Sequence, residues 1–122
     1  MIDFRKAPEF FNPSLVLPVT DAETNEVVQL NFLHTNKALN IFRAYNNKVR
    51  QQLLSFLNEQ KRVPVTEIYR TLKIEQSVAS QPLNTLRRAG LITATREGKW
   101  IYYSINYKRL KEVSKIVDQF LG

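Results

Sequence analysis

The hydrophobic period of the chain changes at a glycine within residues 76–105, and this change constrains the fold more than any other feature. Apolar residues first recur at helical spacing and then meet the glycine, as Val78, Ala79, Leu83, Leu86 and Gly90. Beyond it, Leu91–Arg96 and Trp100–Ile105 alternate with a period of two, which predicts two strands. Gly98 between them can adopt the positive φ of a tight turn. The segment therefore predicts a helix, a glycine stop and a basic β-hairpin.

The residues before this segment predict three more helices, whose apolar positions are Ala38, Leu39, Ile41, Phe42 and Tyr45, then Val49, Leu53, Phe56 and Leu57, then Val65, Ile68, Tyr69 and Leu72. Asn46-Asn47 should break the chain between the first two helices. A last helix is expected over residues 108–121. Two short helices followed by a hairpin are typical of a winged helix-turn-helix. We predict this fold for residues 34–122: mainly α with a small β component, with four helices, a β-hairpin wing and a C-terminal dimerisation helix.

Residues 1–33 have a different character and predict an N-terminal extension. Ser14–Val19 and Glu26–Leu33 have the pattern of two strands joined by a polar turn. Pro18 would confine the first strand to a sheet edge. An isolated hairpin is marginally stable in water, so this one should pack on the main domain or on a second subunit.

Composition limits the classes of function. The net charge of the 122 residues is +7, and residues 34–109 hold fourteen Lys/Arg against four Asp/Glu, whereas residues 1–33 hold two against five. This excess favours a polyanionic partner, although a solvated basic surface has the same composition. The chain has no cysteine, which excludes disulfides and thiolate metal sites. No apolar run would span a membrane, and MIDFRKAPEFF lacks signal-peptide features, so we expect a cytoplasmic protein.

Two stretches, QSVASQPLNTLRRAGLI and REGKWIYYSI, resemble the ArsR/SmtB-type winged-helix repressors. The matching positions are Gln76, Ser77, Ser80, Leu83, Leu86, Arg87, Ala89, Gly90, Leu91, Gly98, Lys99 and Tyr103. Upstream, KVRQQLLSFL is similar to another helix of that family. The resemblance covers about residues 34–121 and excludes residues 1–33. It implies a DNA-binding regulator that acts as a dimer.

The polar residues near the start of the helix after Lys73–Glu75 are candidates for reading bases. In a helix-turn-helix, the N-terminal residues of the second helix meet base edges in the major groove. The candidates are Gln76, Ser77, Ser80, Gln81 and Asn84, and the resemblance implies the first four as reading positions. Gln and Asn can bond adenine bidentately. The alternative is a plain polar surface helix with Ser77 as its N-cap, and the following hairpin favours DNA over it.

Basic residues around this helix are candidates for contacts with the DNA backbone. We expect phosphate or minor-groove contacts from Arg88, Arg96 and Lys99, with further backbone contacts possible for Arg70 and Lys73. Arg87 should be mainly structural. Pro82 departs from the pattern, because proline costs about 3 kcal/mol inside a helix. We expect the helix to persist, either beginning late or kinked near Val78.

The last predicted helix has a wider apolar stripe than a small monomer needs. The resemblance implies a dimer seam with the first helix, formed by Leu110, Val113, Val117 and Phe120. Packing within one core is the alternative. A two-fold dimer would place two reading helices roughly 34 Å apart and select an inverted-repeat operator.

Many regulators of the resembled family sense metals, but the corresponding positions here do not suit a metal. Pro64, Val65 and Thr66 are not soft-metal ligands, the last helix has only Glu112 and Asp118, and the single histidine, His34, lies outside both regions. We predict no metal site and no cofactor. The effector is then an organic ligand, a partner protein or none.

These observations favour a dimeric, sequence-specific transcriptional regulator, with repression as the expected activity. The alternative is a winged-helix module that binds another protein. We expect no enzymatic activity, because the chain lacks cysteine, has one histidine without a nearby Ser/Asp pattern, and has no glycine-rich phosphate loop.

Overall fold

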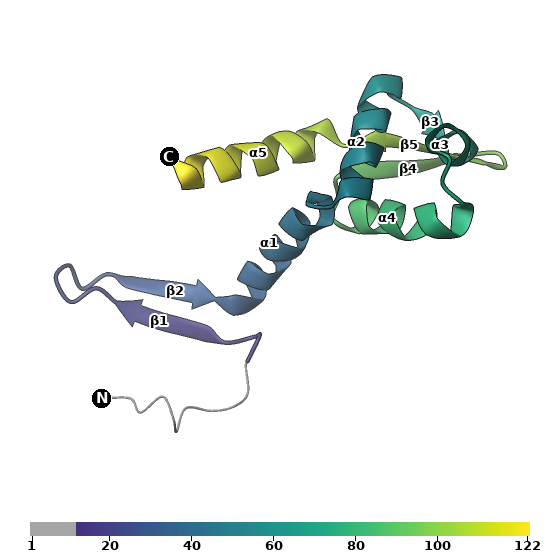
Figure 1. Ribbon diagram of the computed structural model, residues 1–122. Coiled ribbons are helices and arrows are strands. Elements are labelled where there is room, and N and C mark those ends of the chain that lie inside the picture. Colours follow the sequence, from purple (N-terminus) through teal and green to yellow (C-terminus); the bar gives the residue numbers. More distant parts are fainter. Residues whose placement is uncertain (1–11) are drawn as a thin grey trace. The chain divides into compact units, whose positions relative to one another are not determined.

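The computed structural model describes residues 12–122 (Figure 1). The chain divides into two compact units within helix α1 (Phe32–Tyr45), between Asn40 and Ile41. No helix of the described part is long and apolar enough to cross a bilayer. The segment MIDFRKAPEFF, used above to predict the absence of a signal peptide, lies outside the described residues.

The first unit contains the expected N-terminal hairpin. Strands β1 (Val16–Thr20) and β2 (Val27–Asn31) pair antiparallel, with Leu17 opposite Leu30 and Val19 opposite Val28. In the turn, the Asp21 N–H donates to the Glu26 carbonyl at 2.8 Å, and Asn25 takes a positive φ of 60°. Asn tolerates this conformation better than most residues, which explains the polar turn composition.

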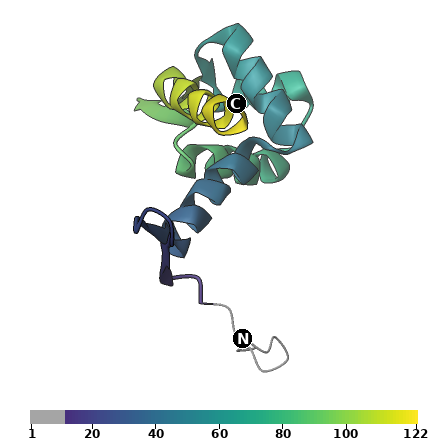
Figure 2. The same cartoon turned by 90° about the vertical axis from the view of Figure 1, so that its left-hand side faces the viewer.

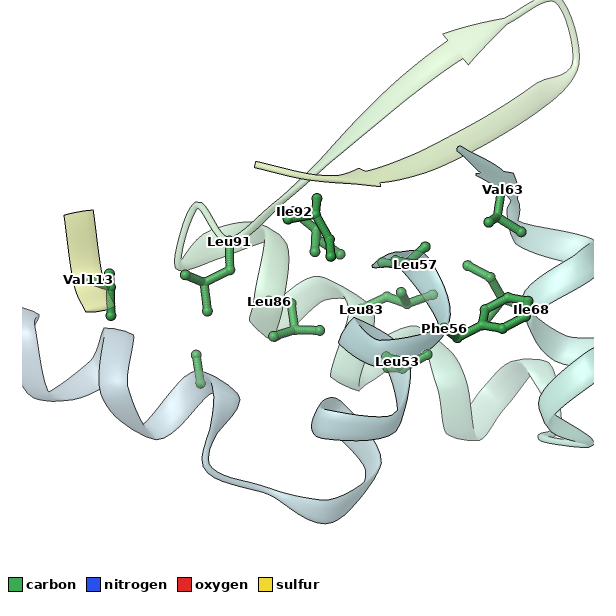
Figure 3. Packing of buried hydrophobic residues seen from close by; sticks show 12 residues of the cluster. Leu53, Phe56, Leu57, Val63, Ile68, Leu83, Leu86, Leu91, Ile92 and Val113 are labelled. Carbon is green, nitrogen blue, oxygen red and sulfur yellow. The ribbon is translucent and has the colours of Figure 1, made fainter. Parts of the chain in front are cut away.

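The second unit is the predicted winged helix-turn-helix, built around one apolar core (Figure 3). Its helices are the end of α1, then α2 (Lys48–Gln60), α3 (Val65–Leu72), α4 (Gln76–Arg88) and α5 (Tyr107–Leu121). They bury apolar side chains at most of the positions that the helical spacing predicts, but Val78, expected on the apolar face of α4, is 54% exposed, and Ala44 is buried without having been predicted. The buried cluster is Ala44, Leu53, Phe56, Leu57, Val63, Ile68, Leu83, Leu86, Leu91, Ile92, Ile105 and Val113.

Side-chain caps explain where two of these helices begin. The Asn47 side chain accepts from the N–H groups of Val49 and Arg50 at 3.0 and 3.2 Å, so the expected break at Asn46-Asn47 is also the N-cap of α2. At α5, the Asn106 side chain accepts from the Arg109 N–H and donates to the Gly90 carbonyl at 3.0 Å. Asn106 thereby joins the glycine stop of α4 to the start of α5.

The wing belongs to a three-stranded sheet rather than to a lone hairpin. Strands β4 (Ile92–Glu97) and β5 (Trp100–Ile105) pair as expected, and β5 also pairs with β3 (Val63–Pro64), giving the order β3-β5-β4. The sequence analysis did not predict β3, because two residues are too few to show a period. This short strand anchors the wing beside α3.

Candidate nucleic-acid interface

A three-residue turn connects α3 to α4 and sets the start of the candidate reading helix. Lys73 ends α3 with a positive φ of 52°, and the Ile74 N–H donates to the Tyr69 carbonyl at 3.0 Å. Helix α4 then begins at Gln76, with Glu75 as an N-cap that makes no side-chain bond. Ser77 lies inside the first turn and is not the N-cap, so this part of the alternative is wrong, while the choice between a DNA-reading helix and a plain polar surface helix stays a prediction.

Helix α4 has one buried face and one polar, exposed face. Ala79, Leu83 and Leu86 are almost fully buried and fix the helix against the core. The four positions that the resemblance implied for base reading, Gln76, Ser77, Ser80 and Gln81, are all exposed. They are accessible to a ligand on the side of α4 away from the core.

Asn84, the fifth polar candidate, has a different environment. It is half-buried, and its side-chain oxygen accepts a hydrogen bond from the Arg87 guanidinium at 3.4 Å. The structural role expected for Arg87 agrees with this contact. Arg88, by contrast, is exposed in the last turn, where a cation also interacts favourably with the helix dipole.

Pro82 lies inside α4 without ending it. The helix runs from Gln76 to Arg88, so the expectation that it persists is confirmed and a late start is excluded. The side chains on either side of Pro82 explain this, because Ala79 and Leu83 are buried and hold both turns in place. Tertiary packing therefore outweighs the roughly 3 kcal/mol that proline costs in an ordinary helix interior.

The turn of the wing carries two basic side chains. Gly98 has a φ of 63°, and the adjoining Glu97 and Trp100 face each other across the strand pair. Arg96 folds back over this turn, with its Nε donating to the Gly98 carbonyl at 3.2 Å. Arg96 and Lys99 are both exposed, as a backbone-gripping role requires.

Arg62 contacts two residues of the wing, a role that was not predicted from the sequence. Its guanidinium lies 3.7 Å from the centre of the Tyr102 ring and 2.5 Å from a carboxylate oxygen of Glu97. A polar, basic linker before an aromatic strand was the only sequence signal for this contact, which depends on the pairing of β3 with β5. Arg70, a candidate backbone contact, is exposed and pairs with Glu67 at 3.0 Å within α3, and Lys73 is exposed in the turn.

The residues predicted for a dimer seam occupy different environments along α5. Val113 is only 6% exposed and belongs to the core of its own chain, whereas Phe120 is 88% exposed. Leu110 and Val117 are half-buried and line an open groove of about 310 Å³ with Tyr45, Ser114 and Asp118. Packing within the chain's own core therefore accounts for the first half of the apolar face of α5, and the second half of that face is exposed to solvent.

The titratable groups of the described residues show no cluster suited to a metal. No three His, Cys, Asp or Glu side chains gather within residues 12–122, and His34 is exposed. The insensitivity to metals stays a prediction. One tyrosine is perturbed: burial first, and the neighbouring Tyr103 second, raise the pKa of Tyr69.

Comparisons with known proteins agree with this architecture. The MarR family model matches residues 52–99, which run from α2 to the wing. An uncharacterized HTH-type transcriptional regulator of Methanocaldococcus jannaschii is 39% identical over 83 residues, covering 68% of this chain and 93% of the relative.

Solved structures give the same result. The transcriptional repressor PagR of Bacillus anthracis superposes with a TM-score of 0.57 at 26% identity, covering 71% of this chain and 99% of that one. An ArsR-like transcriptional regulator from Rhodococcus sp. RHA1 reaches a TM-score of 0.64 at 17% identity, covering 71% and 81%, and shares the fold.

Proposed function

The chain belongs to the ArsR/SmtB-type winged-helix transcriptional regulators, and from this premise we propose that it is a dimeric repressor that binds an inverted-repeat operator. One observation carries the proposal: the exposed polar face of α4 belongs to the same compact unit as a basic wing, while the opposite face of α4 is locked into the core. A rigid helix with exposed amide and hydroxyl groups is suited to reading bases, although the Ser80 hydroxyl also donates to the Ser77 carbonyl at 3.4 Å.

In this proposal the two elements make different contributions. Gln76, Ser77, Ser80 and Gln81 contact base edges in the major groove and supply specificity. Arg96 and Lys99 contact phosphates and supply affinity that does not depend on sequence. Asn84 and Arg88 act at the edge of this footprint, with Asn84 partly occupied by Arg87.

A two-fold dimer would present two copies of α4 to one face of the duplex. The exposed apolar end of α5 and the open groove beside Tyr45 support this assembly, since both offer apolar surface to a second copy. The seam in the proposal combines α5 with α1 and includes Leu110, Val117 and Phe120, with Val113 supporting them from the core. A dimer seated on an operator would exclude other proteins from that DNA, which is why we propose repression.

Selection of duplexes from a random pool, followed by titration at several salt concentrations, tests the proposal. We expect an inverted repeat to be enriched. Gln81→Ala should reduce the preference for the selected site over random DNA by roughly ten-fold, or about 1.4 kcal/mol, which lies within the range expected for a base contact. Lys99→Ala should weaken both DNAs alike and lower the slope of log K against log salt by about 0.9.

Lys108→Ala, an equal charge change at an exposed position of α5, is the control and should leave the site preference unchanged. Enrichment of no sequence, or equal losses on random and selected DNA for Gln81→Ala and Lys99→Ala, would contradict the proposal. A promoter–reporter fusion tests the direction of regulation: deletion of the protein should raise expression.

A further inference from the structure

The N-terminal hairpin has one wholly apolar face. Directly opposite residues share a face of an antiparallel pair, and so do residues two positions apart along a strand. The pairs Leu17–Leu30 and Val19–Val28 therefore lie on the same side. These four side chains are 41–53% exposed. The other side is mixed, with Pro18 opposite Gln29 and Val16 opposite Asn31.

A two-stranded hairpin needs such a face to be covered. Two strands alone are marginally stable in water, and every residue from Asn12 to Leu30 is exposed. A face with only apolar side chains, opposite a face that also carries polar ones, is typical of a sheet with one buried side. The apolar face is therefore a docking surface.

A second exposed apolar surface lies at the end of α5. Ile116, Phe120 and Leu121 are 56%, 88% and 78% exposed, beyond the part of the helix that Val113 fastens to the core. Within its unit, this half of α5 extends away from α2 and α4 (Figure 1), and Figure 2 views the helix nearly along its axis from this end. Three large exposed side chains within six residues are unusual for a helix that contacts only water.

The two surfaces match in length and in charge. Five strand residues span about 17 Å, and the eleven residues from Lys111 to Leu121, ten steps of the helix, rise about 15 Å. The described hairpin carries Asp21, Glu23 and Glu26 and no basic residue, with all three acids in or beside the turn. Helix α5 exposes Lys111 and Lys115, which lie five and one residues before Ile116. Of the two acids in this half of the helix, Glu112 pairs with Arg109 at 3.5 Å and Asp118 follows Ile116. A hairpin laid along α5 would therefore place its acidic turn beside these lysines and its apolar face on Ile116 and Phe120.

We propose that the apolar face of the β1–β2 hairpin docks on the C-terminal half of α5 in a second copy of this chain. The inference rests on the proposed dimer and assigns the partner that completes its seam. β2 ends at Asn31 and α1 begins at Phe32, and the Asn31 side chain accepts from the His34 N–H at 3.0 Å, so the hairpin leads without a linker into the helix proposed for that seam. Two-fold symmetry makes the contact reciprocal, which doubles the apolar area buried by one association.

Engineered cysteines test which copy is contacted, because the chain has no cysteine of its own. One copy carries Val28→Cys, and a second copy with a tag of different size carries Ile116→Cys. After the two are mixed and oxidised with copper–phenanthroline, we expect a disulfide-linked band that contains both tags. Gln29→Cys, one residue away on the opposite face, replaces Val28→Cys in the control and should yield little of it. A cross-link that forms only when both cysteines are in the same chain would overturn the proposal.

A second measurement does not depend on cross-linking geometry. Sedimentation equilibrium should show that Val28→Asp raises the dissociation constant of the dimer about ten-fold or more, because a charge enters an apolar contact. Gln29→Asp adds the same charge on the other face and should change the constant by less than about two-fold. A wild-type dimer with equal constants for both variants overturns the hairpin contact alone. A wild-type monomer overturns the dimer of the proposed function as well, while the selection of DNA by α4 is measured separately.

Discussion

Residues 12–122 form two antiparallel hairpins of nearly equal strand length, and the two differ in the contacts that stabilise them. The wing, β4–β5, gains a third strand from β3 and buries Ile92 and Ile105 at its base. In the N-terminal hairpin, β1–β2, no residue is buried. Strand pairing is the same in both, so stability must come from side chains outside the backbone ladder.

The two hairpins also differ in the charge of their turns. The wing turn carries Arg96 and Lys99, and its single acid, Glu97, is paired with Arg62. The charged residues of the N-terminal turn are all acidic. An anchored basic hairpin suits a polyanion, and an unanchored acidic one suits a basic, apolar protein surface.

The largest difference between the two hairpins is expected when a buried side chain at the base of the wing is shortened. Ile92→Ala should lower the free energy of unfolding by about 2–5 kcal/mol, because Ile92 is only 2% exposed and the vacated space stays open. Val28→Ala in the other hairpin should change it by less than about 0.5 kcal/mol in dilute, monomeric protein. Urea unfolding followed by circular dichroism measures both. Similar losses would mean that the N-terminal hairpin is anchored as well.

A smaller test uses the two turns, since each contains a residue with positive φ. Gly98→Ala should cost about 1 kcal/mol and lower the Tm of the winged-helix unit by about 4–8 °C. Asn25→Ala imposes a similar strain at φ 60° but should leave that Tm unchanged, because it lies in the other unit. Differential scanning calorimetry distinguishes the outcomes, and equal shifts would show that the two units unfold as one.

Periodic patterns predicted most of this fold, and the failures have physical causes. Long apolar repeats marked all five helices and both hairpins, because a buried face leaves a trace in the sequence. Strand β3 was missed, since two residues have no period, and α4 begins one residue before the serine considered as its cap.

The candidate interface was predictable residue by residue only where a helix face determines exposure. The exposure of Gln76, Ser77, Ser80 and Gln81 agrees with the spacing of the buried residues of α4. Their assignment as base-reading positions came from the family resemblance and stays a prediction. The contacts of Arg62 depend on a β3–β5 pairing that no local pattern encodes. Similarly, an apolar stripe on α5 did not distinguish Val113 in the core from the free Phe120, because both positions are apolar on the same helix face.

A weaker effect is expected at the contact between the linker and the wing. Arg62→Gln should destabilise the winged-helix unit by about 0.5–1 kcal/mol, since the stacking on Tyr102 and the ion pair with Glu97 are both partly exposed to solvent. Arg70→Gln, which loses only a helix-surface pair, is the control and should cost about 0.2–0.5 kcal/mol. A larger loss of unfolding free energy for Arg70→Gln than for Arg62→Gln would contradict the stabilising role assigned to the contacts of Arg62.

The smallest effect is a pH dependence near the wing. Burial raises the pKa of Tyr69 above its ordinary value of 10.0, so the folded state holds this proton more tightly than the unfolded state. The resulting stability is present below pH 10 and is lost as the pH rises through the folded-state pKa. The unfolding free energy of Tyr69→Phe should therefore fall less steeply above pH 10 than that of the wild type. Identical slopes for the two proteins would contradict Tyr69 as the source of this pH dependence.

Two prolines lie in edge strands, Pro18 in β1 and Pro64 in β3. A proline has no N–H to offer to an incoming strand, so the edges formed by β1 and β3 do not readily recruit a foreign chain, whereas the other edge strands, β2 and β4, contain no proline. For a hairpin that displays an apolar face, this protection against aggregation matters most. In the N-terminal hairpin, growth by strand addition is thereby disfavoured at β1 and restricted to the β2 side.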